Sequence, residues 1–212
     1  MHAIDSNVNF SGGDWSQACF QNSDVFIDAG EITALFFTDS TLNLSGGEIG
    51  RGVIETTNSQ LNITNGRFGY IRRSEDSTIN ISGGILSQPI SGGENTIVNI
   101  SGGSLGSGVF GFSGSLDASG ELNFFATEAL LNGAPIGLIE NEPFVVTDRD
   151  VTLSLVLEDG SPYEFQLFDK IAGTVSVTVV PEPNNSWILA LLLLPLFRKS
   201  SRQFANLGCD KE

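Results

Sequence analysis

The sequence predicts an all-β protein: a short β-solenoid of six to seven coils with roughly 17–19 residues each, a small antiparallel β cap and a short C-terminal hydrophobic helix. Three observations support this fold class. A short alternating segment that ends in glycine recurs at regular intervals. Glycine makes up 25 of 212 residues, about 12% against a usual ~7%. Finally, no helix of useful length is visible before residue 184.

Each copy of the repeat alternates apolar and polar residues and then turns at glycine. The period of two predicts a short strand with one buried face, and glycine gives the backbone its corner. The last glycines of six copies, at nearly constant spacing, are Gly13, Gly30, Gly47, Gly66, Gly84 and Gly103. A weaker seventh copy occupies residues 116–120, so residues 1–122 are predicted to form stacked coils. A β-sandwich of the same strands is the alternative.

Stacking the copies converts sequence positions into columns on the surface. One outward column is predicted to contain Asn9, Asn43, Asn62, Asn80 and Asn99. Its neighbour is predicted to contain Ser11, Ser45, Thr64, Ser82 and Ser101. Such side chains can hydrogen-bond along the stack, which predicts a polar face that satisfies itself. The alternative is a flat array that binds an ordered ligand, either glycan or ice.

The residue after each corner predicts a charged column. Asp14, Glu31 and Glu48 would stack there and be followed by Arg67. Carboxylates about 4.8 Å apart repel one another, so a solvated acidic corner is expected. A weak calcium site is the alternative. The Gly-Gly-x-Gly-x-Asp repeat of calcium-binding β-rolls is missing, so no metal site is predicted.

Residues 123–179 carry a different strand pattern. Strands are expected at 144–146, 151–157, 163–168 and 175–180, and the Gly160 turn predicts a hairpin between the second and third of them. An open solenoid end exposes strand edges, so this segment is interpreted as a cap. An independent domain is the alternative.

The composition restricts the chemistry. A formal charge of −15 argues against nucleic-acid binding. His2 is the single histidine, and Cys19 and Cys209 lie in different parts of the chain, so neither zinc binding nor a structural disulfide is expected. No catalytic residue or cofactor is predicted. The alternative is a carbohydrate-active enzyme, whose compact charged cluster in the solenoid would be Arg72, Arg73, Glu75 and Asp76.

The last part of the chain has the order of a sorting signal. Residues 180–202 contain a proline-rich motif, an apolar run from Trp187 to Phe197 and a basic end, and residues 203–212 are a polar tail. The motif residues are Val180, Pro181, Glu182 and Pro183, and the basic residues are Arg198, Lys199 and Arg202. This arrangement resembles the PEP-CTERM sorting signal of exported bacterial proteins. A buried core helix or a loosely attached hydrophobic tail is the alternative for the apolar run.

The resemblance implies an exosortase-type partner, transient anchoring in the membrane through residues 187–197, and a bacterium that makes exopolysaccharide. Residues 1–10 have neither a charged nor an apolar region of a secretion signal, so we expect a mis-assigned start, a fragment, or a chain that is not exported. The expected function is an exported structural or adhesive protein of the cell surface or extracellular matrix, with extracellular polysaccharide as a candidate partner. A carbohydrate-active β-helix enzyme or a glycan-binding module is the alternative.

Overall fold

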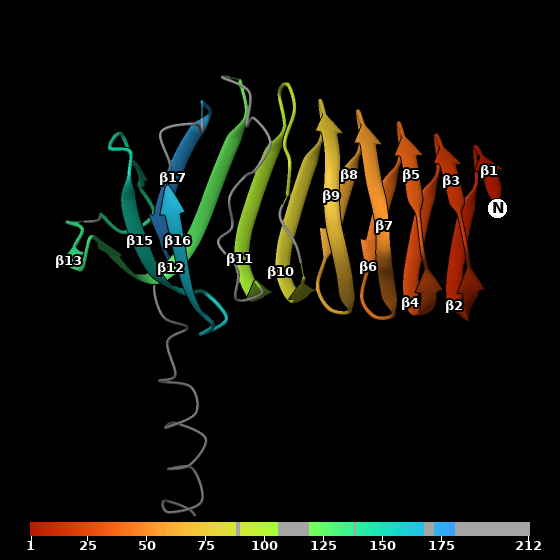
Figure 1. The fold of residues 1–212 in the computed structure, drawn as a ribbon, viewed down its shortest axis with the longest axis horizontal. Helices are drawn as coiled ribbons and strands as arrows, with labels where there is room; N and C mark the ends of the chain where they lie inside the picture. The colour runs from red at the N-terminus through yellow and green to blue at the C-terminus, as the bar shows by residue number, and fades with distance from the viewer. Residues whose placement is uncertain (88–89, 106–118, 138, 168–171, 181–212) are drawn as a thin grey trace, which may run out of the picture. The chain divides into compact units, whose positions relative to one another are not determined.

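The computed structural model describes residues 1–87, 90–105, 119–137, 139–167 and 172–180 (Figure 1). Met1–Val180 forms one compact unit, and Pro181–Glu212 is assigned to a second one. All regular elements among the described residues are strands, which confirms the all-β class.

The first strand of each coil contributes to a parallel sheet whose outer side we call the Asn face. In Figure 1 these strands follow one another from red to green. They are β2 (Asn7–Trp15), β4 (Asp24–Ile32), β6 (Thr41–Leu44), β8 (Gln60–Ile63), β10 (Thr78–Leu86), β11 (Ile97–Leu105) and β12 (Glu121–Leu131). Apolar, Asn and apolar positions stay in register from coil to coil, for example Leu61 beside Leu42 and Ile79.

The solenoid has about five turns, fewer than the six to seven coils that the sequence suggested. The six repeat copies are joined by five steps, and at each step equivalent strands pair in parallel. The next described strand of the column starts at Glu121, and most of the expected seventh copy at residues 116–120 lies outside the described residues. Its Asn123 lies beside Asn99 after a longer step of 24 residues.

A second parallel sheet runs along another side of the same coils. Its strands are β1 (His2–Ile4), β3 (Ala18–Gln21), β5 (Leu35–Thr38), β7 (Glu48–Thr57) and β9 (Arg67–Glu75). The chain bends between the two sheets at the glycine corner, where the last glycine of each of the six copies has φ between 75° and 97°. This region of φ is readily open only to glycine, which explains the periodic glycines.

The inward side chains of both sheets form one apolar core. Along the first sheet, Leu42, Leu61 and Ile79 are at most 1% exposed. Burying an aliphatic side chain contributes roughly 1.5–3 kcal/mol, so every coil adds several such terms to stability. At the N-terminal end the Phe10 ring packs edge-on against Trp15 and Phe20.

Buried serines join successive coils at the turn from the second sheet back to the first. The Ser40 hydroxyl donates to the Thr38 carbonyl at 2.7 Å and accepts from the Ser23 N–H at 3.0 Å. The same two bonds recur at Ser59 and Ser77. These hydroxyls satisfy backbone groups that the core would otherwise leave without partners.

The remaining strands lie beyond the repeats. They are β13 (Ala134–Pro135), β14 (Pro143–Val145), β15 (Val151–Leu157), β16 (Pro162–Leu167) and β17 (Thr174–Val179). β15 and β16 form the antiparallel hairpin that the sequence predicts. β12 contacts both parts of the unit, because it pairs in parallel with β11 and β17 and antiparallel with β15.

Candidate functional site

The most regular feature of the surface is a row of hydrogen-bonded asparagine side chains on the Asn face. The Asn62 amide donates to Asn43 Oδ1 at 2.9 Å, and the Asn80 amide donates to Asn62 Oδ1 at 2.8 Å. The Asn99 amide donates to Asn80 Oδ1 at 2.8 Å. All four side chains are half-buried between inward apolar neighbours. We call this row the Asn ladder.

The two ends of the Asn ladder differ from the sequence-based expectation. Asn9 is in register with Phe26, which in turn pairs with Asn43, so a phenyl ring separates Asn9 from the bonded row. At the other end the ladder is longer than expected. Asn123 donates to Asn99 Oδ1 at 3.1 Å, and the Ser176 hydroxyl donates to Asn123 Oδ1 at 2.7 Å.

The neighbouring hydroxyl column bonds to the backbone and not to itself. The hydroxyls of Ser45, Thr64 and Ser82 donate to carbonyls of the preceding coil at 3.3–3.5 Å. Ser11 is exposed and Ser101 is half-buried. The face is therefore a flat polar surface in which most groups already have one partner in the protein.

A second ladder, which sequence reasoning missed, follows the turn before each first strand. Its residues alternate between acid and amide: Asp5, Asn22, Asp39, Asn58, Asp76 and Asn95. All six have φ between 49° and 52°, a conformation that Asp and Asn tolerate better than most residues. Three amides donate to the acid of the preceding coil, Asn22 to Asp5, Asn58 to Asp39 at 2.6 Å and Asn95 to Asp76 at 2.8 Å.

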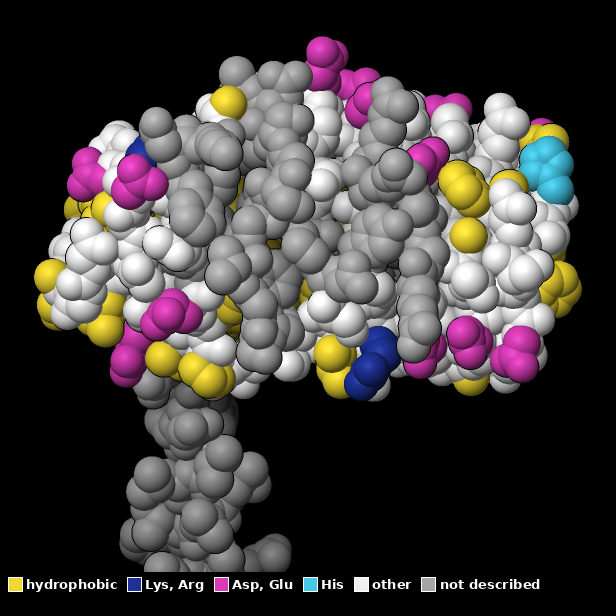
Figure 2. Space-filling model, viewed as in Figure 1, with side chains coloured by type: hydrophobic (Ala, Val, Ile, Leu, Met, Phe, Trp, Pro, Cys, Tyr) yellow, Lys and Arg dark blue, Asp and Glu magenta, His cyan; other side chains and the backbone are white. Residues whose placement is uncertain are grey.

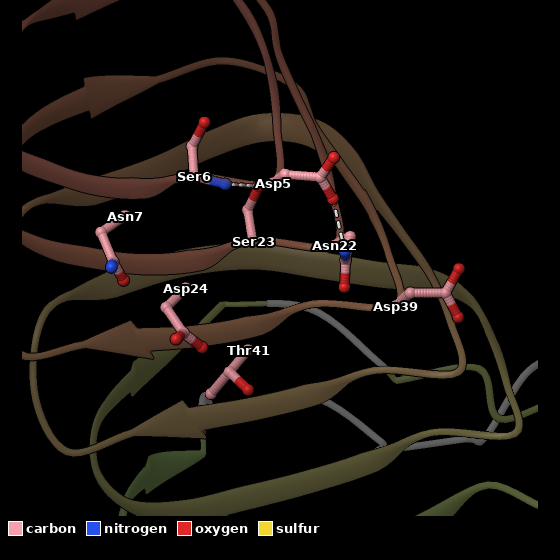
Figure 3. Close-up of a pocket in the computed structure, with 8 residues that line it drawn as sticks. All are labelled: Asp5, Ser6, Asn7, Asn22, Ser23, Asp24, Asp39 and Thr41. Carbon is pink, nitrogen blue, oxygen red and sulfur yellow. Dashed lines mark hydrogen bonds between the residues drawn. The ribbon is translucent and has the colours of Figure 1, made fainter.

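The first rungs of this Asp/Asn column border a polar hollow of about 230 Å³ (Figure 3). Asp5, Asn22 and Asp39 lie along one side, and Asp24 and Thr41 come from the starts of β4 and β6.

The sequence contains a signal for the Asp/Asn column, because an Asp or Asn precedes Ser or Thr at the same place in every repeat. Among the described residues, no group of three or more His, Cys, Asp or Glu side chains has metal-binding geometry.

The acidic corner forms as the sequence predicts. Asp14 pairs with Glu31, Glu31 with Glu48, and Glu48 with Arg67, and all four side chains are exposed. Figure 2 shows acidic side chains gathered along the edge where the first coils turn. The stacked, exposed carboxylates of Asp14, Glu31 and Glu48, followed by Arg67, form the acidic corner that the sequence predicts.

The residues considered for catalysis are not gathered into a described site. His2 is exposed on β1, in register with the half-buried free thiol of Cys19. Glu75 ends β9 and Asp76 belongs to the Asp/Asn column. The side chains of Arg72 and Arg73 lie outside the described set, as does Cys209.

Of the expected sorting motif, Val180 alone is described. Its N–H donates to the Ala126 carbonyl at 2.9 Å, so the compact unit ends where the motif starts. Pro181, Glu182, Pro183, the run 187–197 and the basic residues Arg198, Lys199 and Arg202 lie outside the described residues. Within residues 1–180, as far as they are described, no helix has the length and apolarity needed to cross a bilayer.

Searches with this chain against protein-family models, curated proteins and solved structures return no significant match.

Proposed function

We propose that this chain is an exported structural protein of the bacterial cell surface or extracellular matrix. The observation that carries the proposal is the Asn ladder. From Asn43 to Ser176, side chains of successive strands bond to one another in a continuous row along the Asn face. A face whose groups bind each other along the stack suits a rigid spacer or matrix element.

The position of the proline-rich motif supports export. The compact unit ends at Val180, and Pro181 to Pro183 follow directly. A sorting enzyme needs its recognition segment outside the folded cargo, and the order of the compact unit and the motif along the chain is compatible with that need. The segment 180–202 then acts as a PEP-CTERM-like signal, with residues 187–197 as a membrane anchor before processing by an exosortase-type enzyme.

The strands after the repeats act as a cap in this proposal. The first half of β12, Glu121 to Ala126, pairs with β17, and its second half, Ala126 to Leu131, pairs with β15. The last solenoid strand is therefore covered by strands from later in the chain. Covered edges protect a repeat protein against edge-to-edge association. An exported protein at high local concentration gains solubility from such protection.

The test is fractionation of the producing bacterium with the protein expressed from its own chromosomal locus. We expect the natural protein in the surface or matrix fraction, shorter than its precursor at the C-terminus. Glu182→Ala should leave unprocessed protein in the membrane fraction. The matched control is Glu142→Ala, because Glu142 is an exposed glutamate of the folded unit. Full-length natural protein found only in the cytosol would contradict the proposal.

A further inference from the structure

A hollow of about 300 Å³ opens on the Asn face where the last coils meet the strands that follow them. Its lining residues are Asn80, Ile81, Asn99, Ser101, Phe125 and Glu158. They come from β10, β11, β12 and the turn after β15. The hollow therefore lies directly on the Asn ladder, at the end where the hairpin meets the solenoid.

Phe125 gives this hollow an aromatic wall. It follows Phe124, which pairs with Ile100, just as Ser101 follows Ile100 on the neighbouring strand. Phe125 is half-buried between the buried residues Phe124 and Ala126, as Ser101 is between the buried residues Ile100 and Gly102, so both side chains lie on the outer side of the sheet. The turn after β15 lies beside this ring's strand, because the Glu158 N–H donates to the Phe125 carbonyl at 3.2 Å.

The polar groups around the ring retain hydrogen-bonding capacity. Asn80 and Asn99 each use one amide N–H and one carbonyl lone pair within the ladder, which leaves one donor and one acceptor on each side chain. Within the described residues, neither the Ser101 hydroxyl nor the exposed Glu158 carboxylate has a hydrogen-bond partner. The hollow thus offers donors and acceptors next to an apolar ring.

This combination fits a sugar ring better than other ligands. A pyranose has hydroxyls that both donate and accept, and a C–H face that packs on an aromatic side chain. The described lining residues include no Lys or Arg and a single carboxylate, that of Glu158, which Asp159 follows in the sequence; the chain carries a formal charge of −15. An anionic ligand would therefore be repelled. A single lining carboxylate does not supply the ligand set of a divalent cation.

We propose that this hollow is a subsite for one residue of a neutral polysaccharide chain. This inference rests on the proposed function in one respect: an exported chain would encounter the polysaccharide in the extracellular matrix. The further rungs of the Asn ladder repeat every ~4.8 Å along the stack. A longer oligosaccharide reaches Asn62 and Asn43, so affinity rises with chain length.

The experiment uses the full chain, uniformly labelled with ¹⁵N, and three neutral tetrasaccharides: cellotetraose, maltotetraose and chitotetraose. Tetragalacturonate is the acidic comparison, and a tetrapeptide of glycine and serine is the peptide comparison. We expect at least one neutral tetrasaccharide to shift the side-chain amide signals of Asn80 and Asn99. Its disaccharide should bind more weakly.

Two variants locate the binding. Glu158→Ala removes an exposed side chain, and Phe125→Ala removes the aromatic wall; each should raise the Kd of the best tetrasaccharide at least tenfold. Phe36→Ala is the matched control, because Phe36 is a half-buried phenylalanine of β5 on the other parallel sheet. Its Kd should stay within twofold of the natural chain.

The proposal is overturned if no neutral tetrasaccharide shifts these amides, if Glu158→Ala leaves the Kd unchanged, or if tetragalacturonate or the peptide binds more tightly. Failure of this site and failure of the proposed function are distinguishable. Fractionation of cells reports on export without depending on Glu158. If the chain is located at the surface but does not bind neutral sugars, the sugar site alone is contradicted. If the chain is cytosolic but binds neutral sugars, the export proposal alone is contradicted.

Discussion

Gly103 and Asp159, 56 residues apart, are joined by a hydrogen bond in which the Gly103 N–H donates to Asp159 Oδ2 at 2.7 Å. The Asp159 N–H in turn donates to the Ser101 carbonyl at 3.3 Å, and Oδ1 accepts the Ser161 N–H at 2.9 Å. One turn residue of the hairpin thus attaches the β15–β16 unit to the last glycine corner of the repeats.

Asp159→Ala should therefore weaken the attachment of the hairpin. It removes a charge-assisted bond and a turn bond, and because the site is exposed we expect a loss of about 1 kcal/mol in the free energy of unfolding. Urea denaturation measures this loss. Glu158→Ala, one residue earlier, is the control and should stay within about 0.5 kcal/mol of the natural chain. Equal effects of the two variants would show that the Gly103 bond does not matter.

Asn80 is an interior rung of the Asn ladder, with one side-chain bond on each side. Asn80→Ala removes both and leaves Asn62 and Asn99 with a missing partner, so we expect destabilisation by about 1–2 kcal/mol. Asn9→Ala is the matched control, because Phe26 separates Asn9 from the row. Thermal and urea unfolding should give a near-zero change for Asn9→Ala. A similar cost at both positions would contradict a bonded ladder.

The Asn column shows what sequence could predict. The repeat copies share the apolar–Asn–apolar triplet, and a nearly constant number of residues separates one triplet from the next. Stacked coils keep equivalent positions in register, so the asparagines of successive copies align. Asn123 breaks the step length and lacks a following Gly-Gly. Ser176 lies 53 residues beyond Asn123 and reaches the ladder only because β17 pairs with β12. Periodicity therefore predicts the contacts between repeat copies. It does not predict the contact made by β17, a strand from outside the repeat.

The Asp/Asn column and the hollow at Phe125 illustrate two other reasons for a miss. The alternation from Asp5 to Asn95 is visible in the sequence. Its six residues lie in turns between strands, however, and a search for alternating apolar residues does not consider polar turn positions. The hollow depends on where Glu158 comes to lie beside Phe125. The Glu158 N–H donates to the Phe125 carbonyl at 3.2 Å, a contact between the turn after β15 and strand β12 that no local sequence pattern encodes.

Gly46 is required for space and not for its φ. A Cβ built on Gly46 would overlap the backbone carbonyl of Asp28 in the preceding coil. Backbone cannot move aside as a side chain does, so Gly46→Ala should destabilise by at least ~2 kcal/mol. Gly137→Ala provides the control, because nothing lies within 4 Å of the added methyl group. A midpoint of urea unfolding for Gly46→Ala that matches the control would contradict such close stacking of the coils.

Burial makes the Tyr163 phenol sensitive to alkali. The side chain is 8% exposed and its ring centroid lies 5.6 Å from that of Phe124. Desolvation raises the pKa of Tyr163 well above its ordinary value. The folded state then keeps a proton that the unfolded state releases above about pH 10, so stability falls as pH rises through that range. Tyr163→Phe should flatten the slope of the unfolding free energy against pH above pH 10. The slope near neutral pH should stay as in the natural chain. An unchanged alkaline slope would show that Tyr163 is not its source.

The alternation of acid and amide in the Asp/Asn column predicts that order matters as well as composition. Asn95 donates to Asp76 Oδ1 at 2.8 Å, and Asn58 lies on the other side of Asp76. Asn95→Asp replaces the donor by a carboxylate at hydrogen-bond distance from another carboxylate. Repulsion and the lost bond should then cost about 1 kcal/mol at pH 7. The double variant Asp76→Asn with Asn95→Asp reverses the pair, restores a donor opposite an acceptor and keeps the acids apart. Its urea-unfolding free energy at pH 7 should return to within about 0.5 kcal/mol of the natural chain. If the double variant is as unstable as Asn95→Asp alone, the pair does not act through its hydrogen bond, and the alternation has no electrostatic role.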